Sequence, residues 1–283
     1  MMPLDKRLAR FGLNVNPFAA ATPPTACHLT DAMRHFCDRC HRLVGQGGFA
    51  LVSGESGTGK SALLRCLHAQ LTSRVELVLG VLSRPQASLA DFYRELGALF
   101  GVSLTPHNRW AGAKVLRERW QTHWGTSHQR PVLFLDEAQE MHGKVLNELR
   151  LLATAELDSA ALVTVILAGD QRLHEKFQAR DLLPLASRIR VQHRTEAASN
   201  DDLRRLLDHL LTTSGNRDLM TEGLKHTCVE HACGNRRVLL HLADELLDAA
   251  LADPDCQLLD EHLFTRVVRP PQLPAAARPR KTP

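Results

Sequence analysis

The chain has 283 residues, 44% of them hydrophobic and 23% charged, with a formal net charge of +4 at pH 7. Such a composition is ordinary for a globular protein with one large or two modest domains. No apolar run approaches the roughly 18 to 20 residues that cross a membrane, and residues 1–10 lack the apolar core of a secretory signal. We therefore expect a cytoplasmic protein with no membrane partner, and the mild positive charge is compatible with nucleic acid binding.

Strand and helix patterns alternate through the first two thirds of the chain. An irregular stretch at 1–29 precedes a predicted helix at 30–44, capped by Thr30 or Asp31. Strand signals follow at 49–53, 75–82, 131–136, 162–168 and 188–193. Helical patterns separate them at 60–72, 88–100, 109–124, 142–156 and 171–179. This alternation predicts an α/β fold, a parallel sheet with helices on both faces.

The last third of the chain has no strand signal. Helical patterns after Ser199 fall at 201–211, 221–233, 236–251 and 260–268. We therefore predict an N-terminal linker and helix (1–47), an α/β nucleotide-binding domain (48–196), a small all-helical lid domain (197–268) and a tail (269–283). The tail is basic and rich in Pro and Ala, and we expect it to be disordered.

A glycine-rich sequence lies between the first strand and the helix at 60–72. It is a complete G-x-x-x-x-G-K-[ST] phosphate-binding loop, formed by Gly54, Glu55, Ser56, Gly57, Thr58, Gly59, Lys60 and Ser61. The glycines allow backbone N–H groups to surround phosphates, and the helix N-terminus adds positive potential. We predict that Lys60 reaches the β- and γ-phosphates and that Ser61 holds Mg²⁺, so ATP and Mg²⁺ are the expected cofactors.

Two acidic residues end the apolar strand at 131–136. The carboxyl end of a parallel strand delivers such residues to the edge of the sheet where the phosphate loop lies. Asp136 is predicted to complete the Mg²⁺ site, through water, and Glu137 to act as the base that polarises the attacking water. This pair favours ATP hydrolysis over phosphoryl transfer to a second substrate, and it argues against a small-molecule kinase.

Seven cysteines, an odd number, predict reduced thiols in a cytoplasmic chain. Cys37 and Cys40 precede His41 with the spacing of a haem attachment site, but buried helical thiols are the favoured interpretation without a secretory signal. A second cluster fits no common zinc finger, although zinc is an alternative there. Its members are His226, Cys228, His231 and Cys233.

An α/β nucleotide core followed by a helical lid resembles the AAA+ ATPases. The resemblance implies that Arg188, before the last core strand, is an arginine finger that completes the site of a neighbouring subunit. A surface arginine beside Arg190 is the alternative. The resemblance also implies that Arg237, at the start of a lid helix, is the sensor-2 arginine, with Arg236 as the second choice.

The sensor-1 position of these proteins follows the strand at 162–168 and falls near Asp170. AAA+ proteins usually carry Asn, Gln or Thr there, and an acid would repel the γ-phosphate. Asp170 therefore has another role, or Gln171 does the sensing. The resemblance further places the adenine against residues 27–29, around His28.

Several segments narrow the resemblance to the ExeA/GspA-type branch over roughly residues 8–268. They are 11–13, 16–18, 47–49, 167–173 and 234–246. Secretion-associated ATPases of this branch usually add a membrane segment and a cell-wall-binding region. Transposition regulators of the MuB, TnsC, TniB and IstB kind assemble with ATP as rings or filaments on DNA. Because this chain shows neither a membrane segment nor an extra binding region, we expect it to belong with the transposition regulators.

The expected function is that of an ATPase that oligomerises on double-stranded DNA without sequence preference and recruits or activates a transposase for target selection. The alternative is a secretion or envelope-assembly ATPase that acts on a membrane protein. The candidate DNA contacts are Arg84, which follows the second strand, and Arg109 and Lys114. Such cations would bind DNA phosphates independently of base sequence, and this binding would weaken as the salt concentration rises. The alternative is that these residues only form a solvated helix face.

Overall fold

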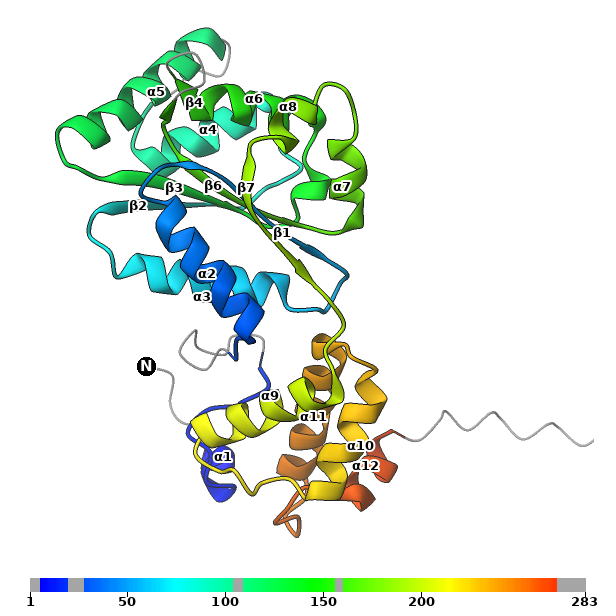
Figure 1. Cartoon of the computed structure of the whole chain (residues 1–283). Coiled ribbons are helices and arrows are strands. Elements are labelled where there is room, and N and C mark those ends of the chain that lie inside the picture. Colours follow the sequence, from blue (N-terminus) through cyan, green and yellow to red (C-terminus); the bar gives the residue numbers. More distant parts are fainter. Residues whose placement is uncertain (1–5, 20–27, 104–108, 156–159, 269–283) are drawn as a thin grey trace, which may run out of the picture. The chain divides into compact units, whose positions relative to one another are not determined.

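The structure is a computed structural model that describes residues 6–19, 28–103, 109–155 and 160–268 (Figure 1). Its contacts separate the described chain into two compact units. One contains residues 28–197, and the other combines residues 6–19 with residues 198–268. The predicted tail at 269–283 lies outside the described residues.

A five-stranded sheet forms the centre of the first unit. Its strand order is β2-β3-β6-β1-β7, and every neighbouring pair is parallel. The strands are β1 (Gly48–Gly54), β2 (Leu77–Leu82), β3 (Arg130–Leu135), β6 (Thr164–Gly169) and β7 (Ile189–Thr195). This arrangement confirms the predicted α/β class, and it places the carboxyl ends of β1, β6 and β3 along one edge.

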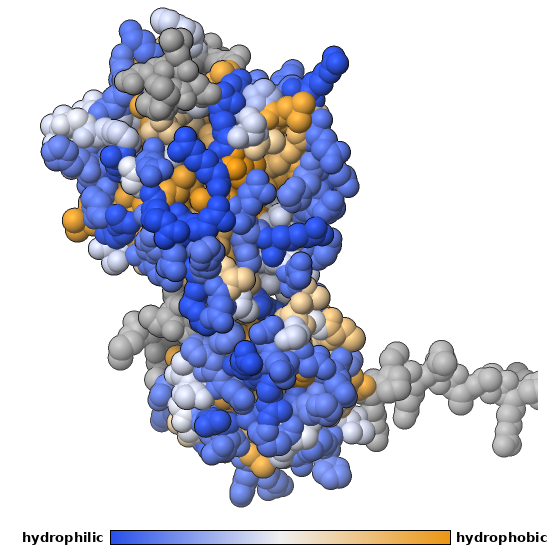
Figure 2. Space-filling view, viewed as in Figure 1, coloured by the Kyte–Doolittle hydropathy of each residue, from blue (hydrophilic) through white to orange (hydrophobic). Residues whose placement is uncertain are grey.

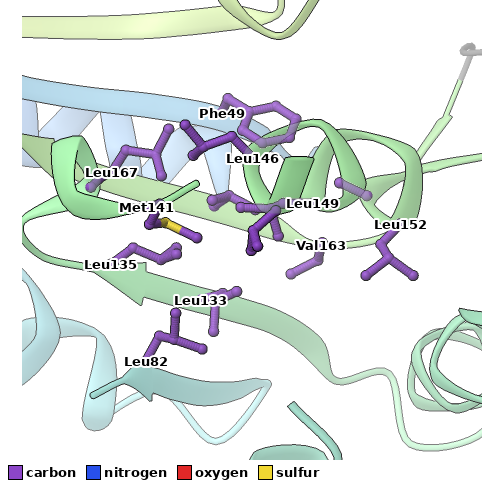
Figure 3. Close-up of a cluster of buried hydrophobic side chains, with 14 of the residues drawn as sticks. Phe49, Leu82, Leu133, Leu135, Met141, Leu146, Leu149, Leu152, Val163 and Leu167 are labelled. Carbon is purple, nitrogen blue, oxygen red and sulfur yellow. The ribbon is translucent and has the colours of Figure 1, made fainter. Parts of the chain in front are cut away.

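Apolar side chains on both faces of the strands explain why the sheet is internal. In β3, Leu133 and Leu135 pack into one hydrophobic cluster, whereas Val132 and Phe134 pack into another on the opposite face. Successive side chains of a strand point to opposite faces, so a continuous apolar run buries both faces at once. Figure 3 shows Leu133 and Leu135 with Met141 and Leu149 in the first cluster.

Helices cover both faces of the sheet (Figure 1). One face carries α2 (Asp31–Leu43) and α3 (Lys60–Thr72). The opposite face carries α4 (Leu89–Phe100), α5 (Arg109–Gly125), α6 (Gly143–Ala153), α7 (Gln171–Phe177) and α8 (Leu183–Ala186). Thr30 caps α2 with its side chain, as predicted, by accepting a hydrogen bond from the N–H of Met33.

The structure contains several short elements that were not predicted. A 3-10 turn, η2 (Ala138–Glu140), follows the two acids at the end of β3. A small antiparallel pair, β4 (Thr154–Ala155) with β5 (Ala160–Ala161), ends α6 at Ala153 instead of 156. Two-residue strands carry too few side chains for a periodic pattern. The sequence therefore predicted a helix that continues past its observed end.

The second unit is helical, with the helices close to their predicted bounds. They are α9 (Asn200–Thr213), α10 (Glu222–Ala232), α11 (Arg236–Ala252) and α12 (Glu261–Val267). Its core also contains Phe11, Leu13 and Phe18, which follow α1 (Lys6–Arg10). The amide of Asn16 donates to Asp244 Oδ1 at 2.7 Å. The predicted segment 1–47 is thus divided, because α2 packs on the sheet.

Cys37, Cys40 and Cys228 are buried thiols, whereas Cys233 is exposed. Burial raises the pKa of Cys37 to about 11 and that of Cys228 to about 12, so both stay protonated and apolar at neutral pH. Among the described residues, no group of three or more His, Cys, Asp or Glu side chains is arranged to hold a metal ion.

The described helices include none with the length and apolar character needed to cross a bilayer. Figure 2 shows that hydrophilic residues cover most of the visible face, with apolar residues reaching the surface in patches.

Candidate active site

The phosphate-binding loop connects β1 to α3 through glycines in left-handed conformations. The φ angles are 152° at Gly54, 82° at Gly57 and 104° at Gly59. At Gly54, an added Cβ would lie 2.3 Å from the backbone oxygen of Thr195. Only glycine fits this close approach between the loop and β7, so the motif glycine at this position has a geometric cause.

Lys60 lies within the loop, with only 6% of its surface exposed. Its ammonium group donates to the backbone oxygen of Gly54 at 2.8 Å and to that of Glu55 at 3.0 Å. The hydroxyl of Thr58 donates to the oxygen of Glu55 at 2.7 Å. These bonds hold the ammonium group of Lys60 against backbone oxygens of the loop, which places a positive charge inside it.

Asp136 and Glu137 lie at the carboxyl end of β3, as predicted. Asp136 is half-buried, and its Oδ1 accepts a hydrogen bond from the N–H of Glu137 at 2.9 Å. Glu137 is exposed and has a φ of 52°, the left-handed region that non-glycine residues rarely occupy. Such backbone strain costs roughly 1–3 kcal/mol and is concentrated at functional sites.

Gln139 is a residue that the sequence reasoning missed. Its amide nitrogen donates to Glu137 Oε2, and its Oε1 accepts from the N–H of Asp170 at 3.2 Å. The side chain is 3% exposed. It therefore bridges the carboxyl ends of β3 and β6. No sequence pattern marks a glutamine two residues after an acid, so this role became visible only in three dimensions.

Asp170 has a structural role at the start of α7. Its side chain accepts from the N–H of Arg172 at 2.9 Å and from the Arg172 guanidinium at 2.9 Å. Burial raises the pKa of Asp170, but the hydrogen bonds from Arg172 and the charges of Arg172 and Lys60 outweigh it and leave the pKa below its ordinary value. An acid at this position was expected to repel the γ-phosphate, but Arg172 pairs with it and neutralises its charge.

Arg188 follows α8 and is half-buried, and its guanidinium donates to the backbone oxygen of Pro184. Arg190, the neighbouring arginine, is exposed on β7. In the helical unit, Asn235 caps α11 by accepting from the N–H of Arg237 at 2.9 Å. Burial lowers the pKa of Arg236, whereas Arg237 is exposed.

The remaining predicted site residues occupy separate places on the first unit. His28 is half-buried ahead of α2. Arg84 is exposed after β2, Arg109 begins α5, and Lys114 forms an exposed ion pair with Glu118 at 3.8 Å. Such surface pairs contribute little to stability.

The residues present fit a nucleotide with its metal ion. Three glycines with positive φ and a nearly buried lysine form the loop, and a Cβ at Gly54 would collide with Thr195 and displace the loop. Ser61 is the second residue of α3, and Asp136 supplies a carboxylate directly after β3, on the same edge of the sheet. Hydroxyl and carboxylate oxygens are the ligands that Mg²⁺ takes beside nucleotide phosphates.

Comparison with known proteins also indicates a nucleotide-binding domain. Residues 41–177 match a family model described as an AAA domain. The chain is 29% identical over 249 residues to general secretion pathway protein A of Aeromonas hydrophila, covering 86% of this chain and 44% of that protein. The chain therefore spans less than half the length of that curated relative.

Solved structures share the fold at low sequence identity. The Aeropyrum pernix ORC2 protein in its ADPNP–ADP complexes has a TM-score of 0.68 at 15% identity, covering 89% of this chain and 71% of that one. The Aeropyrum pernix ORC1 protein in complex with DNA has a TM-score of 0.67 at 16% identity, covering 86% and 66%.

The sheet order, the phosphate loop and the match of residues 41–177 to an AAA domain are those of an AAA+ type P-loop nucleotide-binding core, and the residues present fit ATP with Mg²⁺. The similarity to general secretion pathway protein A supports the predicted resemblance to the ExeA/GspA type.

Proposed function

We propose that this chain is an ATP-driven assembly switch that oligomerises on duplex DNA and recruits or activates a transposase for target selection. The observation that supports a switch is a pair of hydrogen bonds made by Gln139, one to Glu137 and one to Asp170. It ties the predicted base to the end of β6, beside the phosphate loop. A change at the γ-phosphate can therefore alter the position of both acids together.

Each residue of the site has a proposed task. Lys60 binds the β- and γ-phosphate oxygens, and Ser61 and Asp136 hold Mg²⁺, whose charge offsets that of the phosphates. Glu137 accepts a proton from the attacking water. Arg188 of one subunit stabilises charge at the site of its neighbour, and Arg237 senses the same phosphate.

Coupling between nucleotide and assembly needs a difference in affinity between two states. A ligand shifts such an equilibrium only by its differential binding free energy. In our proposal, γ-phosphate contacts of Arg188 and Arg237 exist in the assembled state and are lost after hydrolysis. ATP then favours the DNA-bound ring or filament, and ADP favours release.

The proposed DNA contacts are Arg84, Arg109 and Lys114. One further observation supports a nucleic acid surface along α5. Trp110 is 77% exposed, and aromatic rings beside cations suit stacking and phosphate contact. The other two tryptophans are covered, because Trp120 is buried and the Arg130 guanidinium lies 3.3 Å from the ring of Trp124.

The second candidate function is an ATPase that works on a membrane protein partner in secretion or envelope assembly. The observation that favours it is the 29% identity to general secretion pathway protein A over 86% of this chain. Both candidates share the ATPase site and differ in what the assembled state contacts.

Duplex DNA binding separates the two candidates. The purified protein is mixed with labelled duplex and ATP, a non-hydrolysable analogue, ADP or no nucleotide, across a salt series. The DNA proposal expects large assemblies with ATP or the analogue, and affinity that falls as salt rises. Absence of binding in every nucleotide state would reject it and direct the search to protein partners. An Arg84→Ala, Lys114→Ala variant with unchanged basal ATPase activity should bind DNA more weakly.

A further inference from the structure

We infer that Gln139 is a positioning residue for hydrolysis, which holds the carboxylate of Glu137 in place through one hydrogen bond and anchors itself on β6 through another. The inference rests on the proposed role of Glu137 as the base. It adds a residue outside the phosphate loop and the acidic pair.

The backbone of Gln139 is fixed from several directions. The residue belongs to η2, the turn that begins directly after Glu137. Lys176 of α7 donates its ammonium protons to the backbone oxygen of Gln139 and to that of Met141, the latter at 2.8 Å. The turn is therefore held against α7, and the side chain leaves it from a defined position.

The orientation of the amide is determined by its partners. The N–H of Asp170 can only donate, so the atom facing it at 3.2 Å must be the carbonyl oxygen Oε1. The NH₂ group then faces Glu137 Oε2, which as a carboxylate only accepts. Glutamine satisfies both partners at once, whereas glutamate would repel Glu137 and methionine would bond neither.

The end of β6 leaves just enough room for this amide. An added Cβ at Gly169 would lie 2.9 Å from Gln139 Oε1 and 2.7 Å from Leu173 Cδ2. Both separations are shorter than van der Waals contact, so a methyl group at this position would displace the amide. Gly169 and Gln139 therefore fit each other as a pair.

Glu137 needs such support because its own surroundings are open. Its side chain is exposed, and among the described residues no other side chain donates a hydrogen bond to its carboxylate. A free carboxylate would sample several rotamers, whereas a general base must stay within hydrogen-bond reach of the water. Gln139 restricts that choice without contacting the substrate.

Gln139→Met tests the inference, because methionine keeps the length of the side chain and removes both hydrogen bonds. We expect kcat to fall by about 10-fold to 100-fold, as for a reacting group displaced by about 1 Å. The Kd for ATP, measured separately, should change less than about 2-fold. Gln178→Met is the matched control, since Gln178 is exposed at the end of α7 and should leave both constants unchanged.

A second variant acts on the same contact from the other side. Gly169→Ala keeps Gln139 but pushes on its amide, and it should also lower kcat while ATP still binds. If Gln139→Met folds poorly, as judged by its melting temperature, this variant carries the test. Wild-type kcat in either folded variant, or a parallel loss of ATP binding, would overturn the inference.

A double-mutant cycle separates this inference from the proposed role of Glu137. In Glu137→Asp, the shortened carboxylate withdraws from Gln139, so adding Gln139→Met should cost little more. An equal, additive cost would show that Gln139 acts elsewhere and would reject the inference alone. Normal hydrolysis by Glu137→Gln would instead reject the base assignment itself.

Discussion

The hydroxyl oxygens of Thr58 and Thr195 lie 2.6 Å apart and join the phosphate loop to the last residue of β7. Thr195 is 4% exposed, and its hydroxyl also lies 3.2 Å from the backbone oxygen of Ser53. Three residues later the chain enters the helical unit at Ala198. The loop that binds phosphate is thus bonded directly to the segment that leads to the lid.

Thr195→Val tests this connection, because valine has the same shape but no hydroxyl. Losing one buried hydrogen bond costs about 1 kcal/mol, which corresponds to a factor of about 5. We expect the free energy of unfolding to fall by about this amount and the Kd for ATP to rise by about 5-fold. Urea unfolding and nucleotide titration measure the two effects, and Thr195→Ser should retain wild-type values.

Thr164→Val is a matched control in the same sheet. Thr164 is 1% exposed, and its hydroxyl has no hydrogen-bond partner among the described residues. Removing an unpaired buried hydroxyl should be neutral or stabilising. If both valine variants behave alike, the bond between Thr58 and Thr195 does not support the loop.

Lys60→Ala removes the charge at the centre of the phosphate loop. A hydrogen bond to a charged group is worth about 1.5–3 kcal/mol, and this lysine reaches two phosphates in our proposal. The Kd for ATP should therefore rise by about 100-fold or more, with no detectable turnover. Isothermal titration measures the affinity, and Lys114→Ala is the control that should bind ATP normally. Binding within a few-fold of wild type would contradict the assignment.

Glu137→Gln should separate binding from hydrolysis. Glutamine cannot take a proton from water, and a general base contributes about 10²-fold to 10⁴-fold to the rate. We expect turnover to fall by that factor while ATP remains bound, so that the assembled state accumulates. Phosphate release and light scattering report the two quantities. Ordinary turnover would show that another group acts as the base.

The motif and the strand patterns predicted the elements that carry local signals. The loop from Gly54 to Ser61 and the acids after β3 lie where the sequence placed them, because glycine spacing and apolar runs act over a few residues. Gln139 and Arg172 could not be found in this way. Their roles depend on partners supplied by a different element or by a cap.

The place of the N-terminal segment in the helical unit was also beyond sequence reasoning. Phe11, Leu13 and Phe18 pack with helices that begin almost 200 residues later. Such pairing is long-range and leaves no local pattern, since an apolar residue in an irregular segment can pack on any surface. The same limit applies to Arg188 and Arg237, whose proposed roles depend on a neighbouring subunit or on bound nucleotide.

The pKa of Asp170 predicts how stability depends on pH. Its folded value lies below the unfolded value of about 3.9, so the stabilising effect is present above about pH 4 and disappears as the pH falls through the folded pKa. Asp170→Asn keeps a good helix cap but loses the ion pair with Arg172. The free energy of unfolding should drop by about 0.5–1 kcal/mol at pH 7 and by less near pH 3. A constant difference would mean that charge is not involved.

Arg188→Ala tests whether one subunit completes the site of another. Because an arginine finger contributes about 10³-fold or more to turnover, the variant should bind ATP normally and hydrolyse it poorly, while Arg190→Ala should resemble the wild type. Mixing Arg188→Ala with Glu137→Gln is the decisive measurement. In a mixed assembly, a subunit with intact Glu137 can receive Arg188 from its neighbour, so turnover should exceed that of either variant alone. If mixing restores nothing although mixed assemblies form, Arg188 does not act across the subunit boundary.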